Sequence, residues 1–241
     1  DDRARLTVGE AGDGEIGSGE VEPDSRLRRS EAGTGAYGLR LDRGVMHALI
    51  WAPPGQLQVD TPSSTAIDLG CAYTLRVADD GSGLVEVTSG WVGFEWKGRE
   101  SFIPAGAVCA TRPGIGPGTP HYATVTPDLE AAIARFDFEA RDPAGRAAAL
   151  DVILAEAQPA DAVTLWHLVQ RADPGDRDRI FDRLAAFVPP PDGVTREGVR
   201  AGNREMTDRW WEALGLGSME LWRTWQQRWR DRAAPLDATA R

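Results

Sequence analysis

The sequence predicts a protein of segregated α+β class, with an N-terminal all-β domain and a C-terminal all-α region. Three observations predict this division. Apolar and polar side chains alternate from Ile67 to Val77, as in a strand with one buried face. A pattern of strand residues and glycine that begins at Leu39 returns 46 residues later, at Val85. Beyond Thr126 the spacing of the apolar residues becomes helical.

The first 30 residues predict short strands around a glycine-rich connection. Leu6 and Val8, and later Val21, have the character of strand residues, and residues 22–25 (EPDS) have the composition of a turn. The connection at 11–20 lacks the lysine and hydroxyl residue that end a phosphate-binding loop, and it lacks the ligand spacing of an EF-hand. We therefore interpret it as a loop without a ligand.

Residues 38–54 and 84–98 share a weak internal repeat. The matching positions are two aliphatic residues and a glycine, at Leu39, Leu41 and Gly44 and again at Val85, Val87 and Gly90. A strand, a kink that glycine permits and a second strand form a unit that cannot bury its apolar face alone. We therefore expect a stacked, solenoid-like or sandwich-like β-domain over residues 1–112.

A hairpin is predicted inside the central stretch of this domain. Residues 79–83 (DDGSG) supply turn chemistry after the alternating segment, and Leu84, Val85 and Val87 restart the apolar pattern. Asp60 and Asp68 flank the turn at Thr61–Pro62, and we expect them to cap backbone amides.

Helices are expected after a proline- and glycine-rich segment at 113–125, which we interpret as a linker. Thr126, Asp142 and Asp173 each precede a proline, which is the signature of a helix N-terminus. Apolar stripes follow, and the breaks between them are closely spaced. We therefore expect residues 126–192 to form a small array of helical hairpins.

The last segment, residues 193–241, is rich in tryptophan. Five of these side chains fall on two predicted helices, at Trp210, Trp211, Trp222, Trp225 and Trp229. Two interpretations stay open. The tryptophans fold back over the chain as an intramolecular clasp, or they form a surface that docks a partner or lies near a membrane interface.

The two cysteines, Cys71 and Cys109, both lie in β-patterned segments. They are either a disulfide that ties layers of the sheet together or two buried thiols. An oxidising compartment would favour the disulfide.

Three segments resemble the FecR-type domain, the extracytoplasmic β-rich module of the ferric-citrate-regulator family of transmembrane signalling proteins. They are TPSSTAIDLGCAYTLRV at 61–77, VEVTSGWVGFEW at 85–96 and RESFIPAGAVCATRPG at 99–114. The resemblance covers about the first half of the chain and identifies no active site. It implies a β-solenoid-like fold and a periplasmic, membrane-associated location. It also implies a role as the outer part of an anti-sigma-type regulator, with a membrane helix upstream of Asp1.

Composition limits the partners. The net charge of −10 argues against nucleic acid and against anionic membrane surfaces. No apolar run reaches the length of a membrane helix, and no signal peptide is recognisable. The partners that we expect are therefore envelope or membrane proteins.

No catalytic, cofactor-binding or metal-binding residues are predicted. The three histidines, His47, His121 and His167, form no metal-ligand pattern, and no Gly-x-Ser-x-Gly motif accompanies them. Asp79 and Asp80 are interpreted as turn residues. We therefore expect a non-enzymatic, extracytoplasmic protein-interaction module. The alternatives are a structural accessory subunit that braces a larger membrane-protein complex from its periplasmic side, and an enzyme with two facing carboxylates in a cleft.

Overall fold

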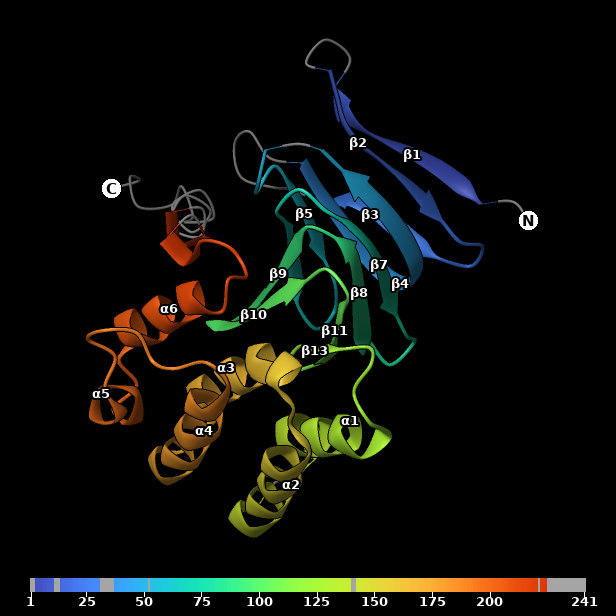
Figure 1. The fold of residues 1–241 in the computed structure, drawn as a ribbon. Coiled ribbons are helices and arrows are strands. Elements are labelled where there is room, and N and C mark those ends of the chain that lie inside the picture. The colour runs from blue at the N-terminus through green and yellow to red at the C-terminus, as the bar shows by residue number, and fades with distance from the viewer. Residues whose placement is uncertain are drawn as a thin grey trace, which may run out of the picture.

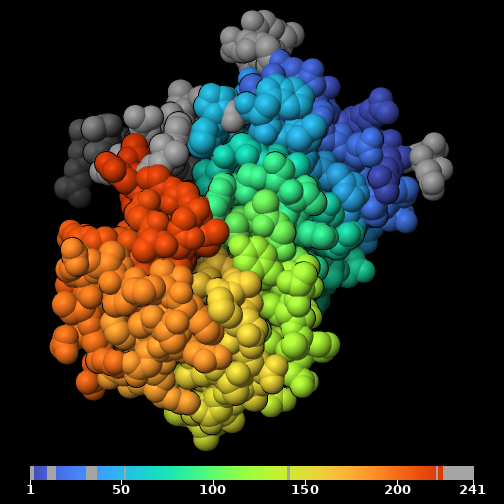
Figure 2. Space-filling view, in the orientation of Figure 1, coloured from blue at the N-terminus to red at the C-terminus, as the bar shows by residue number. Residues whose placement is uncertain are grey.

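The computed structural model describes residues 3–10, 14–30, 37–51, 53–139, 142–220 and 222–224. It consists of a strongly curled β-sheet followed by a group of helices that packs against one side of the sheet (Figure 1). The two parts are in close contact over a broad front in the space-filling view (Figure 2). The expected division into an N-terminal β-part and a C-terminal α-part is confirmed.

The β-part is a mixed sheet that forms a nearly closed barrel. Its strands are β1 (Ala4–Glu10), β2 (Gly14–Val21), β3 (Arg26–Ser30), β4 (Tyr37–Ile50), β5 (Leu57–Asp60), β6 (Thr65–Asp68), β7 (Ala72–Val77), β8 (Gly83–Ser89), β9 (Trp91–Trp96), β10 (Arg99–Pro104), β11 (Ala107–Arg112), β12 (Gly116–Pro117) and β13 (His121–Tyr122). Nine of them follow the order β10-β9-β6-β5-β4-β7-β8-β11-β12. Only the β4–β5 pair is parallel among the described strands. Side-chain hydrogen bonds join the two ends of this path: Arg99 Nε donates to Pro117 O (2.5 Å), and Ser101 Oγ donates to Gly118 O (2.7 Å).

The expected solenoid-like or sandwich-like stack is therefore wrong. Strand β4 pairs with β3 and β5 through its first half and with β2 and β7 through its second half. It bends between the halves at Gly44, which has a φ of +100°. The other glycine of the repeat, Gly90 (φ +67°), joins β8 to β9. The repeat therefore marks two kinks at which the chain passes from one half of a barrel to the other.

The predicted strand from Ile67 to Val77 is also interrupted. The chain turns at Leu69 and Gly70 (φ +82°), so that β6 ends at Asp68 and β7 begins at Ala72. The alternation predicts the burial of Tyr73, Leu75 and Val77 in β7 correctly. It does not hold across the turn, because Ile67 packs in the core of the helices and Asp68, an outward position of the pattern, is 2% exposed. The hairpin between β7 and β8 is confirmed.

The segment at 113–125 is part of the barrel wall. Strands β12 and β13 both pair with β11, and residues 116–121 are buried. Proline and glycine here shape short strands that turn sharply, so the segment does not separate two domains as a linker would.

The helical part contains α1 (Pro127–Ala134), a π-helical turn (Arg135–Glu139), α2 (Pro143–Glu156), a 3₁₀ turn (Pro159–Asp161), α3 (Ala162–Arg171), α4 (Pro174–Phe187), α5 (Arg196–Arg200) and α6 (Arg204–Ala213). The predicted caps at Thr126 and Asp142 are confirmed, since their side chains accept from Leu129 N (3.2 Å) and Gly145 N (2.7 Å). Helix α4 begins after Asp173, as predicted, but without a side-chain cap.

Candidate functional site

Strand β10 lies at the junction between the barrel and the helices, and its two faces are buried in different cores. Ile103 belongs to the barrel core, whereas Phe102 belongs to the core that the helices form. The Phe102 ring centroid lies 4.4 Å from that of Trp222 and 5.9 Å from that of Trp211. Edge-to-face contacts of this kind add stability beyond the buried area. The helices are therefore packed directly on this strand.

The tryptophans of the C-terminal region contribute to this junction. Trp210, Trp211 and Trp222 are 0%, 2% and 4% exposed, so these three side chains are not available to a partner on the folded surface. Their burial agrees with the interpretation of these three tryptophans as an intramolecular clasp. Gly93 of β9 permits the contact, because a Cβ atom there would lie 2.3 Å from the Trp222 ring. Trp225 and Trp229, also predicted as partner contacts, lie outside the described residues.

A buried ionic network holds α3 against the barrel. Asp137 accepts from Arg99 Nη2 (2.6 Å) and from the backbone N–H of Thr119 (2.6 Å), and Arg171 Nη1 lies 3.8 Å from the same carboxylate. Arg171 also donates to Ser101 Oγ (2.6 Å) and Thr119 Oγ1 (2.5 Å). Burial lowers the pKa of Arg171 to about 10, so the side chain stays a cation at neutral pH. These contacts fix the position of α3 on the sheet.

His167 completes the junction as a neutral side chain. Its Nε2 accepts from the backbone N–H of Phe102 (3.0 Å), which assigns the proton to Nδ1, and Nδ1 donates to Val163 O (2.7 Å). Burial, and secondarily the charge of Arg171, lowers the pKa of His167 to about 3. Both ring nitrogens are therefore engaged within the protein, and the imidazole is not a proton donor or acceptor for a ligand.

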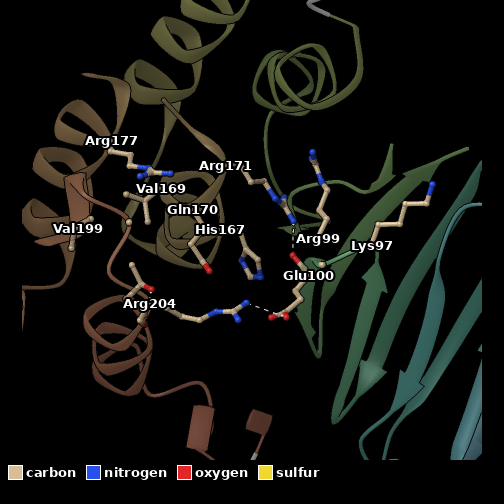
Figure 3. Close-up of a pocket in the computed structure, with 13 residues that line it drawn as sticks. Lys97, Arg99, Glu100, His167, Val169, Gln170, Arg171, Arg177, Val199 and Arg204 are labelled. Atoms are coloured by element: carbon tan, nitrogen blue, oxygen red, sulfur yellow. Dashed lines mark hydrogen bonds and ion pairs between the residues drawn. The ribbon is translucent and has the colours of Figure 1, made fainter. Parts of the chain in front are cut away.

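Beside this network the β9–β10 turn and helices α3 to α6 enclose a cavity of about 410 Å³, shown in Figure 3. The cavity is lined by cationic side chains from both parts of the chain, namely Lys97, Arg99, Arg171, Arg177 and Arg204. Glu100 is the one carboxylate among the described lining residues. We call this cavity the junction pocket. It is basic although the chain as a whole has a net charge of −10.

Glu100 is held on the wall of the junction pocket. Its Oε1 lies 3.1 Å from Arg204 Nη2 and its Oε2 lies 2.6 Å from Arg223 Nη1, and its side chain is 7% exposed. Arg223 also pairs with Asp208 (2.8 Å). The carboxylate thus neutralises part of the local positive charge.

Sequence reasoning missed the junction pocket. Its cations are scattered from Lys97 to Arg204 and form no local motif. One signal was present: Lys97 is the only lysine of the chain. In the structure it stands at the β9–β10 turn with a φ of +50°, a conformation uncommon for residues other than glycine.

The two cysteines are free and buried, so the structure does not contain the disulfide. Cys71 Sγ donates to Asp68 Oδ2 (2.9 Å), and Cys109 Sγ donates to Gly118 O (3.2 Å). Burial raises the pKa of the Cys71 thiol and raises that of Cys109 to about 12. The interpretation as two buried thiols describes this arrangement.

Asp68 is the buried carboxylate of the barrel turn. Burial raises its pKa from 3.8 to about 6, and hydrogen bonds from Cys71 and from the backbone of Gly70 oppose that shift. The bond from Gly70 N (2.7 Å) is the backbone cap that the sequence predicts for this residue. Asp60, in contrast, accepts from the hydroxyls of Ser30 and Thr65.

The other candidate residues from the sequence, His47 and Asp80, form hydrogen bonds within the β-sheet and its turns. His47 contacts Glu22 and Thr74 on the outer face of the sheet, and Asp80 caps the β7–β8 turn through Ser82 N (2.8 Å). Among the described residues no three His, Cys, Asp or Glu side chains are grouped as a metal site would require. Within the same ranges, none of the helices has both the length and the hydropathy of a membrane span.

No protein-family model matches the chain, and no curated protein matches it. The FecR-type resemblance of residues 61–114 is therefore not confirmed by a family model. Among solved structures, the chain is similar to two crystal structures of a "putative anti-sigma factor" from Parabacteroides distasonis ATCC 8503, at 1.65 and 2.50 Å resolution. Each is 12% identical and covers 56% of this chain, with TM-scores of 0.41 and 0.40. The match spans 61% of those chains, and a likeness this small does not assign a function.

Proposed function

We propose that this chain is a non-enzymatic protein-interaction module that binds its partner at the junction pocket. The observation that carries the proposal is the pocket itself, a basic cavity of about 410 Å³ whose walls come from both the barrel and the helices. Its volume falls in the range of ligand-binding cavities.

The chemistry of the lining favours binding over catalysis. A general acid or base needs a titratable group that is free to exchange a proton with the substrate. His167 uses both nitrogens within the protein, and Glu100 is paired with two arginines. What the pocket offers to a ligand is positive charge and hydrogen-bond donors.

The surroundings of the pocket favour a preformed site. Arg171 and the aromatic side chains around Phe102 hold the two walls together, so a partner would not have to order them on binding. A segment that touches both walls would bind the barrel and the helices as one unit.

The cellular setting of the proposal comes from the FecR-type motifs at 61–114. In this setting the module is extracytoplasmic and membrane-associated, and its partner is an envelope or membrane protein to which it relays or from which it receives a signal. A structural accessory subunit of a membrane complex would use the same pocket without relaying a signal.

Photo-crosslinking tests the proposal. A photoreactive amino acid is placed at Gln170, which lines the pocket, and, as a control, at Val152 of α2, which is 39% exposed and outside the pocket. We expect crosslinks from Gln170 to an envelope or membrane protein and none from Val152. Recovery of a receptor or sigma-factor pathway protein supports regulation, and stoichiometric recovery of an integral membrane complex supports the structural subunit. Equal crosslinking from both positions, or none from Gln170, would refute the proposed site.

A further inference from the structure

Building on the proposed function, we propose that the junction pocket recognises an acidic peptide segment of the partner, through the side chains of Lys97, Arg177 and Arg204. The ligand is a short stretch that carries at least two Asp or Glu carboxylates.

The charge of the pocket points to an anionic ligand. Among the residues that the structure describes, five cationic side chains and one carboxylate line the cavity. Asp137, which pairs with Arg99 and Arg171, is buried, with 1% of its side chain exposed. Positive charge gathered in a concave, partly desolvated site attracts carboxylates more strongly than the same charge on a flat surface. The lining of the pocket is thus positive in a chain whose net charge is −10.

Within the described ranges, three of the five cations pair with an acid and two do not, and Arg204 is among the three because it pairs with Glu100 (3.1 Å). Arg99 and Arg171 are engaged with Asp137 and with backbone oxygens. Lys97 and Arg177 form no ion pair with any described residue. Arg177 donates from Nη1 to Arg200 O (3.0 Å), while its buried Nε has no hydrogen-bond partner among the described residues.

Lys97 provides a second, independent indication. A lysine at φ +50° keeps the turn in a conformation that glycine or asparagine adopts more easily. Lys97 is one of the residues that line the pocket, and its ammonium group lies 5.5 Å from the centroid of the Trp96 ring. Figure 3 shows its side chain extending over the sheet, on the side away from His167. Backbone outliers of this kind occur preferentially at functional sites. The position suits a group that captures a charged ligand at the entrance.

A peptide fits the pocket better than a polyanion does. The net charge of −10 disfavours a nucleic acid or an anionic membrane, because their extended negative charge would interact with the whole chain. Acidic side chains on a peptide bring separate charges into the pocket without extending a charged backbone over the surface.

Glu100 acts as an internal competitor for the ligand. Its carboxylate lies 3.1 Å from Arg204 in the wall of the pocket, where a ligand carboxylate would pair. Removing the charge of Glu100 leaves the positive charge of Arg204 available to pair with a ligand carboxylate. We therefore expect Glu100→Gln to bind an acidic peptide more tightly than the wild-type chain does.

The test uses the full chain and a capped hexaglutamate peptide, with capped hexaglutamine and inorganic phosphate as the other probes, in calorimetric titrations at low salt. We expect hexaglutamate to bind, hexaglutamine not to bind, and added salt to weaken the affinity. The double variant Lys97→Gln/Arg177→Gln should lose about tenfold or more in affinity, and Glu100→Gln should gain severalfold. Arg5→Gln/Arg43→Gln removes the same charge from exposed positions outside the pocket and should change the affinity little. Near-UV circular dichroism verifies that each variant is folded.

Equal losses in the two double variants would show that only net charge matters and would overturn the proposal. Binding of phosphate without binding of hexaglutamate would overturn the peptide assignment, as would no binding of hexaglutamate at all. These outcomes are separable from the crosslinking experiment, because a partner captured from Gln170 without peptide binding leaves the interaction site standing and removes only its charge preference.

Discussion

The barrel and the helical part bury their apolar side chains in different ways. The barrel core consists of strand residues and Cys71 of the β6–β7 turn, with fully buried side chains such as Leu41, Val59 and Phe94. The core of the helical part includes Ile67 and Phe102, which the barrel strands supply. The helices therefore need the barrel to complete their core, whereas the barrel core is complete without the helices. Dependence between the two parts is one-sided.

The polar groups that are buried in the two parts follow the same contrast. In the barrel, Ser63 Oγ pairs with Thr111 Oγ1 (2.5 Å), and Cys71 pairs with Asp68. At the junction, Arg171 and His167 of α3 are satisfied by groups of β10. Detaching the helices therefore breaks the hydrogen bonds between α3 and β10, whereas the buried polar pairs within the barrel stay intact.

The largest expected effect comes from separating the two parts. A fragment of residues 3–125 should unfold cooperatively, because its core is its own. A fragment of residues 126–224 should keep helical far-ultraviolet dichroism while losing its near-ultraviolet signal and binding a hydrophobic dye, because the barrel's Phe102 and Ile67 are gone. A cooperative thermal transition in the isolated helical fragment would contradict this one-sided dependence.

Breaking the buried ionic network should have the next largest effect, a decrease in the free energy of unfolding. Arg171→Met leaves Asp137 buried with a weakened set of partners, and we expect it to lower the free energy of unfolding by about 3–5 kcal/mol. The matched control is Arg179→Met, whose partner Asp151 is 63% exposed in its side chain, with an expected loss below about 1 kcal/mol. Urea denaturation measures both. Similar losses would mean that the junction network contributes no more than a surface pair.

Substitutions of two buried phenylalanines, one in each core, test whether the barrel and the helical part unfold separately. Phe102→Ala and Phe94→Ala should each cost roughly 3–5 kcal/mol, because both side chains are buried. Native-state hydrogen exchange should distinguish them. Phe102→Ala should reduce the protection of amides in α3 and α6 while the barrel amides keep theirs, whereas Phe94→Ala should weaken both parts. Identical exchange profiles would show that the two cores unfold as one.

The smallest effect is the pH dependence that Asp68 adds to the barrel. Because its pKa in the folded state is about 6, above the ordinary 3.8, the folded state binds the proton more tightly than the unfolded state. The cost of ionising Asp68 is thus full above pH 6 and disappears below about pH 4. Relative to Asp68→Asn, the wild-type chain should gain up to about 3 kcal/mol of stability as the pH falls from 7.5 to 4.

The opposite contribution of His167 cancels in this comparison. Its pKa of about 3 in the folded state means that the unfolded chain takes up the proton first, so both proteins lose stability as the pH falls below 6.5. Chemical denaturation across this pH range measures the difference between the two proteins. A difference that does not change with pH would contradict the raised pKa of Asp68.

The candidate site was less predictable than the fold. Lys97 stood out in the sequence only as a solitary lysine, and Arg99, Arg171, Arg177 and Arg204 did not stand out among many arginines. Their convergence depends on α3 and α6 docking against β10, which no short stretch of sequence encodes. The tryptophans were noticed, but whether Trp211 faces a partner or Phe102 depends on the same docking.

By itself the sequence determined the change from strands to helices at Thr126, the helix starts at Thr126 and Asp142, and the turn between β7 and β8. These features depend on the chemistry of a few neighbouring residues. Only the tertiary structure decided that the strands curl into a barrel, that Cys71 and Cys109 are free thiols, and that scattered cations line one pocket. Those outcomes depend on contacts between residues far apart in the chain, and local periodicity fixes which side chains are buried without fixing what they are buried against.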